Sequence, residues 1–159
     1  MTLRDGARTA EVVSGDSAAV LRRFTTEPIA AAVWRRTLTS DLVQLLAVHA
    51  LLVPAVPRRL RLERIVDDGC RRFHADHVGS RLRCTYAGPG TECLPAWAVD
   101  AERPADGGND HVLDASAAWR CATGWVLLMR GTTGSGPAQF HRSPPRDAAG
   151  PRLLVAIDA

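Results

Sequence analysis

The chain has 159 residues, which suits one domain with a hydrophobic core. Hydrophobic residues make up 46% of it and the formal net charge is only +3, so the composition is not that of a disordered protein. All 20 basic residues are arginines, and they are scattered rather than gathered in one basic block. We therefore expect solvated surface arginines and no nucleic-acid partner. The arginine pairs concerned are Arg22 and Arg23, Arg35 and Arg36, Arg58 and Arg59, and Arg71 and Arg72.

The N-terminal segment is charged and lacks the apolar core of a secretory signal, and no apolar stretch reaches the length of a membrane span. These features predict a cytoplasmic protein with no membrane partner. In that compartment the four cysteines are expected to be reduced, and none of them belongs to a C-x-x-C pair. We expect them to be small buried hydrophobic side chains rather than a four-cysteine zinc site. The sequence points to no particular substrate, small molecule or protein, and to no oligomeric state.

The first part of the chain has a helical pattern. Residues 1–16 are expected to form a flexible leader, and residues 17–57 a helical prefix that packs on the domain that follows. Apolar spacing in the prefix predicts two helices, the second of them capped by the T-S-D run at residues 39–41 and ending before Pro54. His49 lies among the leucines of this second helix, so we expect it to be a structural histidine.

From residue 58 the period becomes that of β-strands, with glycine and proline turns between the runs. In residues 81–86 we expect the arginines to face outward and Leu82, Cys84 and Tyr86 to face inward. Short strands of this kind predict that residues 58–159 form a mainly β domain, a small antiparallel barrel or jelly roll of about eight strands. The predicted strands are residues 60–66, 70–76, 81–86, 119–122, 124–129, 139–142 and 152–157.

His74 and Asp76 form an H-x-D motif. Residues i and i+2 of a strand share one face, so this imidazole and this carboxylate would point to the same side. His141, from a distant strand, would complete a 2-His-1-carboxylate triad, which leaves half of an octahedral Fe(II) open to substrates. His77 would lie on the opposite strand face, in solvent or behind the ligands, and His111 in a polar loop is not expected to be a ligand. An ordinary hydrogen-bonded His–Asp pair is the alternative.

An arginine, Arg152, follows His141 by eleven residues at the start of the last predicted strand. This order resembles that of the iron and 2-oxoglutarate oxygenases. The resemblance implies that residues 58–159 form the fold of those enzymes, a double-stranded β-helix (jelly roll, cupin-like). The resemblance implies that Arg152 pairs with the far carboxylate of 2-oxoglutarate, a role that suits a planar guanidinium. Many of these enzymes have a hydroxyl group two residues later, where this chain has Leu154. Tyr86, on the strand that follows the H-x-D motif, could supply that hydroxyl.

Three longer runs contain these residues: C-x-x-F-H-x-D at 70–76, T-Y-x-G-P-G-T-E at 85–92 and H-R-S-P at 141–144. They closely resemble a bacterial domain-of-unknown-function family, number 1826. The chain departs from that family at Cys93, where tryptophan is usual, and at Arg130, where lysine is usual. The resemblance implies a metal context connected with zinc homeostasis, without an established reaction. Candidates for contacts with the substrate or with the metal ligands are Thr85, Arg142, Ser143 and His77.

Two functions are consistent with this sequence. In the first, the protein is a non-haem Fe(II)- and 2-oxoglutarate-dependent hydroxylase. Its three ligands hold Fe(II), Arg152 and Tyr86 bind 2-oxoglutarate, and the long polar segment 95–110 helps to define the substrate. In the second, it is a non-catalytic zinc-binding protein of metal homeostasis on the same fold. The same ligands would then bind Zn(II) only, with Cys70 or Cys84 nearby.

Overall fold

The computed structural model describes residues 6–12, 32–54, 57–66, 69–103, 108–145 and 151–159, with side chains from Arg36 onward. A long helix, α2 (Ala32–Leu52), accompanies eight strands and two short 3-10 helices (Ala96–Ala98 and Ala115–Ala117). The strands are β1 (Gly6–Val12), β2 (Arg58–Ile65), β3 (Ser80–Ala87), β4 (Glu92–Cys93), β5 (Trp119–Arg120), β6 (Val126–Arg130), β7 (His141–Arg142) and β8 (Arg152–Asp158).

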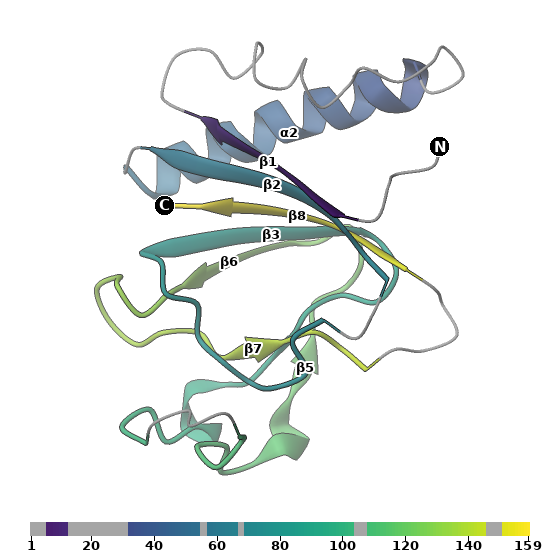
Figure 1. Ribbon diagram of the computed structural model, residues 1–159. Coiled ribbons are helices and arrows are strands. Elements are labelled where there is room, and N and C mark those ends of the chain that lie inside the picture. The colour runs from purple at the N-terminus through teal and green to yellow at the C-terminus, as the bar shows by residue number, and fades with distance from the viewer. Residues whose placement is uncertain (1–5, 13–31, 55–56, 67–68, 104–107, 146–150) are drawn as a thin grey trace.

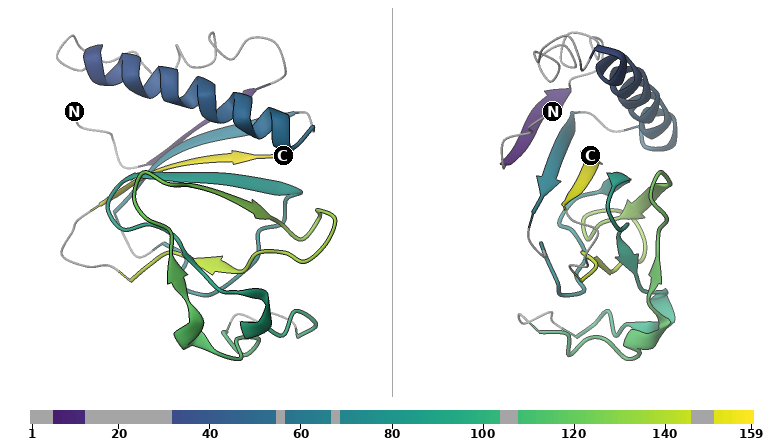
Figure 2. Two further views of the ribbon diagram at one scale, coloured as in Figure 1. Left: turned by 180° about the vertical axis from the view of Figure 1, so that it is seen from behind. Right: turned by 90° about the vertical axis from the view of Figure 1, so that its right-hand side faces the viewer.

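The strands form two sheets with antiparallel neighbours. The larger has the order β1-β2-β8-β3-β6 and the smaller the order β5-β4-β7. Figure 1 shows α2 on one side of the larger sheet and the smaller sheet on the other, and Figure 2 shows the same layers from behind and from the side. Strand β8 is central and is covered on both faces, so its residues form an almost continuous buried apolar run. These residues are Leu154, Val155, Ala156 and Ile157.

The main hydrophobic core lies between α2 and the larger sheet. Leucines at helical spacing on α2 pack against alternate residues of three strands, because every second residue of a strand points to the same face. The opposite face of the same strands is therefore left for other side chains. The buried core residues are Leu38, Leu42, Leu45 and Leu46 of α2, Leu60 and Leu62 of β2, Leu82 and Cys84 of β3, and Val155 and Ile157 of β8.

His49 has a structural role, as predicted. Its ring is fully buried, Arg58 Nε donates to His49 Nδ1 at 3.2 Å, and His49 Nε2 therefore donates to Ser80 Oγ at 3.0 Å. Burial, together with the positive charge of Arg58, lowers the pKa of His49. The buried Arg58 also corrects the expectation that the paired arginines lie on the surface, since only Arg59 of this pair is exposed.

One helix takes the place of the predicted capped helix and continues N-terminally beyond the cap. The leucines from Leu38 to Leu46 form one continuous stripe along α2 and pack against the strands of the larger sheet. This packing outweighs the local preference of residues 39–41 for a helix N-terminus. Ser40 Oγ instead accepts from Gln44 Nε2, one turn later, at 3.4 Å. Residues 17–31 of the predicted prefix lie outside the described residues. Within the described part of the chain, no helix combines the length and the apolarity that crossing a membrane requires.

The structure is mainly β with an N-terminal helix, as predicted, but its strands differ in detail. Seven strands, β2 to β8, lie in the predicted domain, and an eighth, β1, lies in the predicted flexible leader. β1 pairs with β2 from Gly6↔Arg64 to Val12↔Arg58 and so covers an edge that would otherwise be open. The rest of the leader, residues 1–5 and 13–16, is outside the described residues. Among the described strands the two sheets do not close into a barrel.

We expect Leu42→Ala to lower the free energy of unfolding by about 2–5 kcal/mol, because it opens a cavity in the core between α2 and the larger sheet. Leu42 is 1% exposed, whereas the next residue, Val43, is 39% exposed. Val43→Ala is therefore the matched control and should change stability by less than about 1 kcal/mol. Urea unfolding followed by circular dichroism measures both. Equal losses for the two variants would contradict the described packing of α2.

Candidate metal centre

The face of the larger sheet that looks toward the smaller sheet carries charged side chains. In β3, Arg81 and Arg83 point to this face, while Leu82 and Cys84 point to α2. This corrects the expectation that the arginines face solvent: Arg81 is only 8% exposed, because the smaller sheet lies on this side. The register pairs Arg81 with Asp158 of β8, which places an acid beside it on the same face.

The backbones of His74 and His141 bring the two predicted histidine ligands together. They form an isolated antiparallel bridge in which the N–H of each donates to the C=O of the other, both at 2.9 Å. Residues 70–76 form no complete strand, in contrast to the prediction, yet the bridge fixes His74 as a strand would. Residues directly opposite in such a pair point to the same side, and the two ring centroids are 4.6 Å apart.

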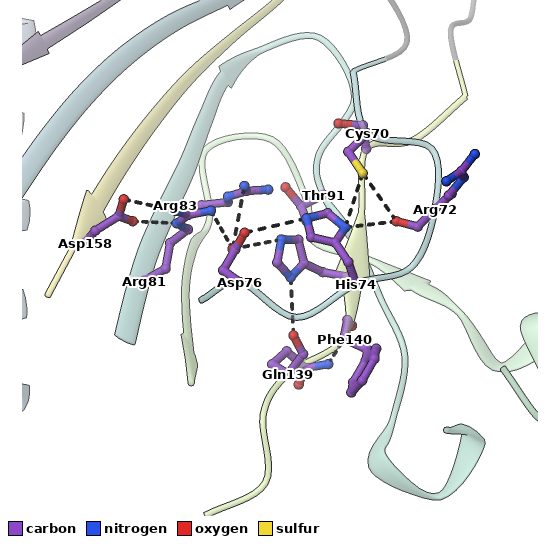
Figure 3. A network of polar contacts seen from close by, with 12 residues as sticks. Cys70, Arg72, His74, Asp76, Arg81, Arg83, Thr91, Gln139, Phe140 and Asp158 are labelled. Carbon is purple, nitrogen blue, oxygen red and sulfur yellow. Dashed lines mark hydrogen bonds and ion pairs between the residues drawn. The ribbon is translucent and has the colours of Figure 1, made fainter. Parts of the chain in front are cut away.

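Asp76 completes the cluster (Figure 3). Its Oδ1 is 3.5 Å from His74 Nε2, and its Oδ2 is 3.1 Å from His141 Nε2. One potential ligand atom from each of the three residues lies within 4.8 Å of the others, and in the described part of the chain they are the one group of three candidate metal ligands. The structure thus brings together the three residues that the sequence selected.

The outer nitrogens of both rings are engaged by backbone carbonyls. His74 Nδ1 donates to the carbonyl oxygen of Arg72 at 2.9 Å and His141 Nδ1 to that of Gln139 at 3.3 Å. A neutral imidazole carries one N–H, so each Nε2 then presents a lone pair to the carboxylate of Asp76. His141 Nε2 is moreover buried without a hydrogen-bond donor. Hydrogen-bond acceptors that converge in this way need a metal cation or a proton between them. Two imidazole nitrogens and a carboxylate suit a divalent transition metal as ligands.

Without a metal ion a proton can take its place: a protonated histidine also carries an N–H at Nε2 and can donate it to Asp76. The pKa shifts of the three groups reflect this protonated form. Burial lowers the pKa of His141, whereas the hydrogen bond to Asp76 raises that of His74. Burial alone would raise the pKa of Asp76, but hydrogen bonds from the two histidines and the charge of Arg81 bring it far below its usual range. The carboxylate is therefore ionised, and a proton on His74 would compete with a metal ion as the pH falls.

Arg81 links Asp76 to the last strand, a connection that the sequence reasoning missed. Its Nη1 is 2.5 Å from Asp76 Oδ2, while its Nε and Nη2 contact the two oxygens of Asp158 at 2.5 and 2.9 Å (Figure 3). Arg61 holds the same Asp158 at 3.0 Å. A charged side chain in contact with a ligating carboxylate orients it, so this ion pair places Arg81 to fix Asp76. The sequence did contain one signal: Arg81 and Asp158 each alternate with the apolar residues of their own strand, which places both on the charged face.

Arg152, predicted to anchor an acid, is buried in the same region. It is 5% exposed, and its recorded partners in the described chain are hydroxyl groups: Ser143 Oγ at 3.2 Å and Thr91 Oγ1 at 3.4 Å. Its Nε is buried without a partner. Burial, with the nearby charges of Arg83 and Arg120, lowers the pKa of Arg152 to about 10. A buried guanidinium without a carboxylate can receive an anion.

Tyr86 does not lie in this region, which corrects the prediction that it supplies a hydroxyl to a bound acid. It faces α2, packs against the main core and donates a hydrogen bond to Asp41. Burial and this contact raise the pKa of Tyr86. Its neighbour Thr85 occupies the other face and is buried. The hydroxyls beside Arg152 come instead from Ser143, which was a candidate, and from Thr91, which was not.

The remaining polar candidates support the chain around the cluster. Arg142 donates to Glu92 at 2.8 Å, and its guanidinium lies over the Phe73 ring at 4.3 Å, so it stabilises the segment that leads to His74. His111, outside the cluster as predicted, contacts the Phe73 carbonyl oxygen at 2.8 Å. His77 is exposed and contacts a threonine hydroxyl at 3.0 Å.

All four cysteines are free. Cys84, Cys93 and Cys121 are buried, as expected for small hydrophobic side chains, and burial raises the pKa of Cys84 to about 11 and that of Cys93 to about 12. Cys70 is exposed, contrary to that expectation. Its Sγ is 3.4 Å from His74 Nδ1, the ring atom that points away from Asp76, so Cys70 lies behind the cluster.

A cavity of about 270 Å³ borders the chain that leads to His141. Residues 139–140 line it, together with Met129 of β6 and with Ala96 and Val99 from the long polar segment. The lining is mixed, with the apolar side chains joined by the guanidinium of Arg130 and the amide of Gln139. The segment that the sequence assigned to substrate definition therefore contributes to a cavity beside a candidate ligand.

We expect Arg81→Met to weaken Zn(II) or Fe(II) binding by about 10–100-fold, because the Asp76 carboxylate would lose the group that orients it. Competition with a chromophoric chelator under anaerobic conditions measures the affinity. Arg59→Met is the matched control, since Arg59 is an exposed arginine on β2 of the same sheet. Unchanged metal affinity in Arg81→Met would indicate that the backbone bridge alone positions the ligands.

Solved structures of similar fold include three proteins. Dioxygenase for auxin oxidation 1 from Arabidopsis thaliana, in a binary complex with 2-oxoglutarate, aligns with a TM-score of 0.52 at 12% identity, over 96% of this chain and 62% of the plant enzyme. The dioxygenase for auxin oxidation of rice has a TM-score of 0.47 at 16% identity, over 96% and 55%. A cupin protein from Bacteroides fragilis has a TM-score of 0.40 at 9% identity, over 69% and 71%.

At 12% identity the likeness to the Arabidopsis enzyme concerns the fold alone. No curated protein sequence matches the chain. The model of a family described as proteins of unknown function, DUF1826, matches residues 37–158, from the first turns of α2 to the end of β8. This match spans the cluster, Arg152 and the core that supports them, and so the chain belongs to the DUF1826 family.

Proposed function

We propose that this protein is an Fe(II)- and 2-oxoglutarate-dependent oxygenase that hydroxylates a C–H bond of its substrate. The observation that carries the proposal is the convergence of His74 Nε2, the Asp76 carboxylate and His141 Nε2 on one point. Two further observations support it. Arg152 is buried nearby with hydroxyl partners only, and the Arabidopsis enzyme of similar fold was solved with 2-oxoglutarate.

Each residue has a distinct role in this proposal. His74, Asp76 and His141 would hold Fe(II), and three protein ligands leave coordination positions for other molecules. When bound, Fe(II) would supply the redox chemistry by which O₂ converts 2-oxoglutarate to succinate and CO₂ and adds one oxygen atom to the substrate. Arg152 would hold the far carboxylate of 2-oxoglutarate through its guanidinium, with Ser143 orienting the side chain.

The cavity beside Gln139 is the proposed place for the substrate. The apolar side chains of its mixed lining would contact a carbon skeleton, and Arg130 and Gln139 would orient polar groups of the substrate. Ala96 and Val99 belong to the segment 95–110, so this segment would help to define the substrate. The substrate and 2-oxoglutarate would then be held by different sets of residues, because Arg152 does not line this cavity.

A second candidate function is non-catalytic binding of Zn(II) by the same three residues. The composition of the cluster favours it, because two imidazoles and a carboxylate bind Zn(II) more tightly than Fe(II) when geometry makes no further demand. In that case Arg152 would have no acid to bind. Cys70 and Cys84 would not be ligands, since one lies behind His74 and the other faces α2.

The test is an anaerobic Fe(II) titration followed by measurement of succinate formed from 2-oxoglutarate after admission of O₂. We expect Fe(II)-dependent succinate formation by the unmodified protein and a loss of Fe(II) binding in His141→Ala. Arg152→Met should raise the KM for 2-oxoglutarate about 10–100-fold, as expected for the loss of hydrogen bonds to a charged group. His77→Ala is the control for His141→Ala, since His77 is exposed and outside the cluster.

Two outcomes would contradict the oxygenase proposal. Fe(II) binding that survives His141→Ala unchanged would mean that the three residues are not the ligands. Tight Zn(II) binding with no succinate formation, and with no effect of Arg152→Met on 2-oxoglutarate binding, would favour the zinc-binding alternative.

A further inference from the structure

A second guanidinium without an acid of its own, that of Arg83, lies on the charged face of the larger sheet. The Arg83 side chain is 13% exposed, and its ion-pair contact within the described chain is one distance of 3.9 Å from Nη2 to Asp76 Oδ2. That oxygen is already held by Arg81 at 2.5 Å. Arg83 Nε is also buried without a hydrogen-bond partner. Arg83 is therefore close to the cluster but is not neutralised by it (Figure 3).

This arrangement leaves the face with excess positive charge. Four arginines, Arg61, Arg81, Arg83 and Arg152, stand against three acids, Glu63, Asp76 and Asp158. Burial lowers the pKa of Arg83, which reflects the cost of this uncompensated charge. Burying a cation without a partner is energetically costly. A divalent metal would add to the excess, and an anion would offset it.

Arg83 and Arg152 lie on paired strands and are separated along them. Arg83 of β3 is opposite Ala156 of β8, and Arg152 is four residues from Ala156 on β8. At about 3.4 Å per residue the two positions are roughly 13 Å apart along the sheet. Positions 152 and 156 of β8 are an even number of residues apart, so the Arg83 and Arg152 side chains both point to the charged face. Such a pair suits a ligand that has an anionic group at each end.

We propose that Arg83 is a second anion-binding residue of this region, and that the region takes a short dicarboxylate held at two points. Arg152 holds the carboxylate far from the metal cluster, and Arg83 holds the one that lies beside Asp76. The inference rests on the proposed role of Arg152 and extends it. It requires that the protein distinguish a dicarboxylate from a monocarboxylate even without metal, because both contacts are made by side chains.

Glutarate and pentanoate are suitable probes, since they have the same number of carbon atoms and differ in one carboxylate. Neither has the keto group that would chelate a metal. Binding to the metal-free full-length protein is measured by isothermal titration calorimetry, for the unmodified chain and for Arg83→Met, Arg152→Met and Arg59→Met. Thermal unfolding of each protein without ligand tests whether the substitutions disturb the fold.

We expect glutarate to bind the unmodified protein about tenfold or more tightly than pentanoate, as one additional charged contact provides. Arg83→Met should bring the glutarate affinity down to that of pentanoate and leave pentanoate unchanged. Arg152→Met should weaken both ligands, and Arg59→Met neither. Arg83→Met should also unfold at no lower a temperature than the unmodified protein, because it removes a buried charge without a partner.

The inference is overturned if Arg83→Met leaves the ratio of glutarate to pentanoate affinity unchanged. It is equally overturned if Arg83→Met destabilises the ligand-free protein and has no effect on glutarate, since Arg83 would then only neutralise Asp76. The experiment contains neither iron nor oxygen. If glutarate is preferred and the preference depends on Arg83, the inference therefore holds even when no succinate is formed. If the preference is absent, the inference fails even when succinate is formed.

Discussion

The ionised carboxylate of Asp76 is the charge on which the arrangement of the site depends. It lies between His74 and His141, whose outer nitrogens are committed to backbone carbonyls, and it is held from behind by Arg81. A buried carboxylate is costly unless its partners are held in place. Here the partners are fixed by backbone hydrogen bonds between the histidines and by the pairing of Arg81 with Asp158. The site is therefore preorganised by the sheet rather than by flexible side chains.

The two faces of the larger sheet divide stability and chemistry between them. The face toward α2 is apolar, and the leucines of the helix close it. The other face holds four arginines and three acids, whose burial costs free energy that the apolar face has to offset. Strand β8 serves both faces, because Val155 and Ile157 enter the core while Arg152 and Asp158 enter the charged region. A proposed site for metal and acid is thus built on the most buried strand of the fold.

The errors in the sequence predictions have a common physical origin. Alternation in residues 81–86 indicated a strand but not what covers each face, so Arg81 and Arg83 were assigned to solvent and Tyr86 to the site. The smaller sheet reverses that assignment, because it covers the arginine face. The T-S-D run at residues 39–41 has the local chemistry of a cap, yet the leucine stripe of α2 continues through it. The preference of a few residues for a cap or for one strand face contributes less free energy than the packing of a whole helix or sheet face.

The sequence by itself determined the identity and order of the candidate ligands, the position of Arg152 and the mainly β character of the chain. Each depends on local chemistry: an H-x-D spacing, a histidine and an arginine near glycine-bounded runs, and alternation of apolar residues. Only the tertiary structure decided that His74 and His141 pair through their backbones, that Arg81 secures Asp76, and that Thr91 and Ser143 replace Tyr86 beside Arg152. These contacts join segments far apart in the chain, and their partners follow from strand order and register, which no local pattern specifies.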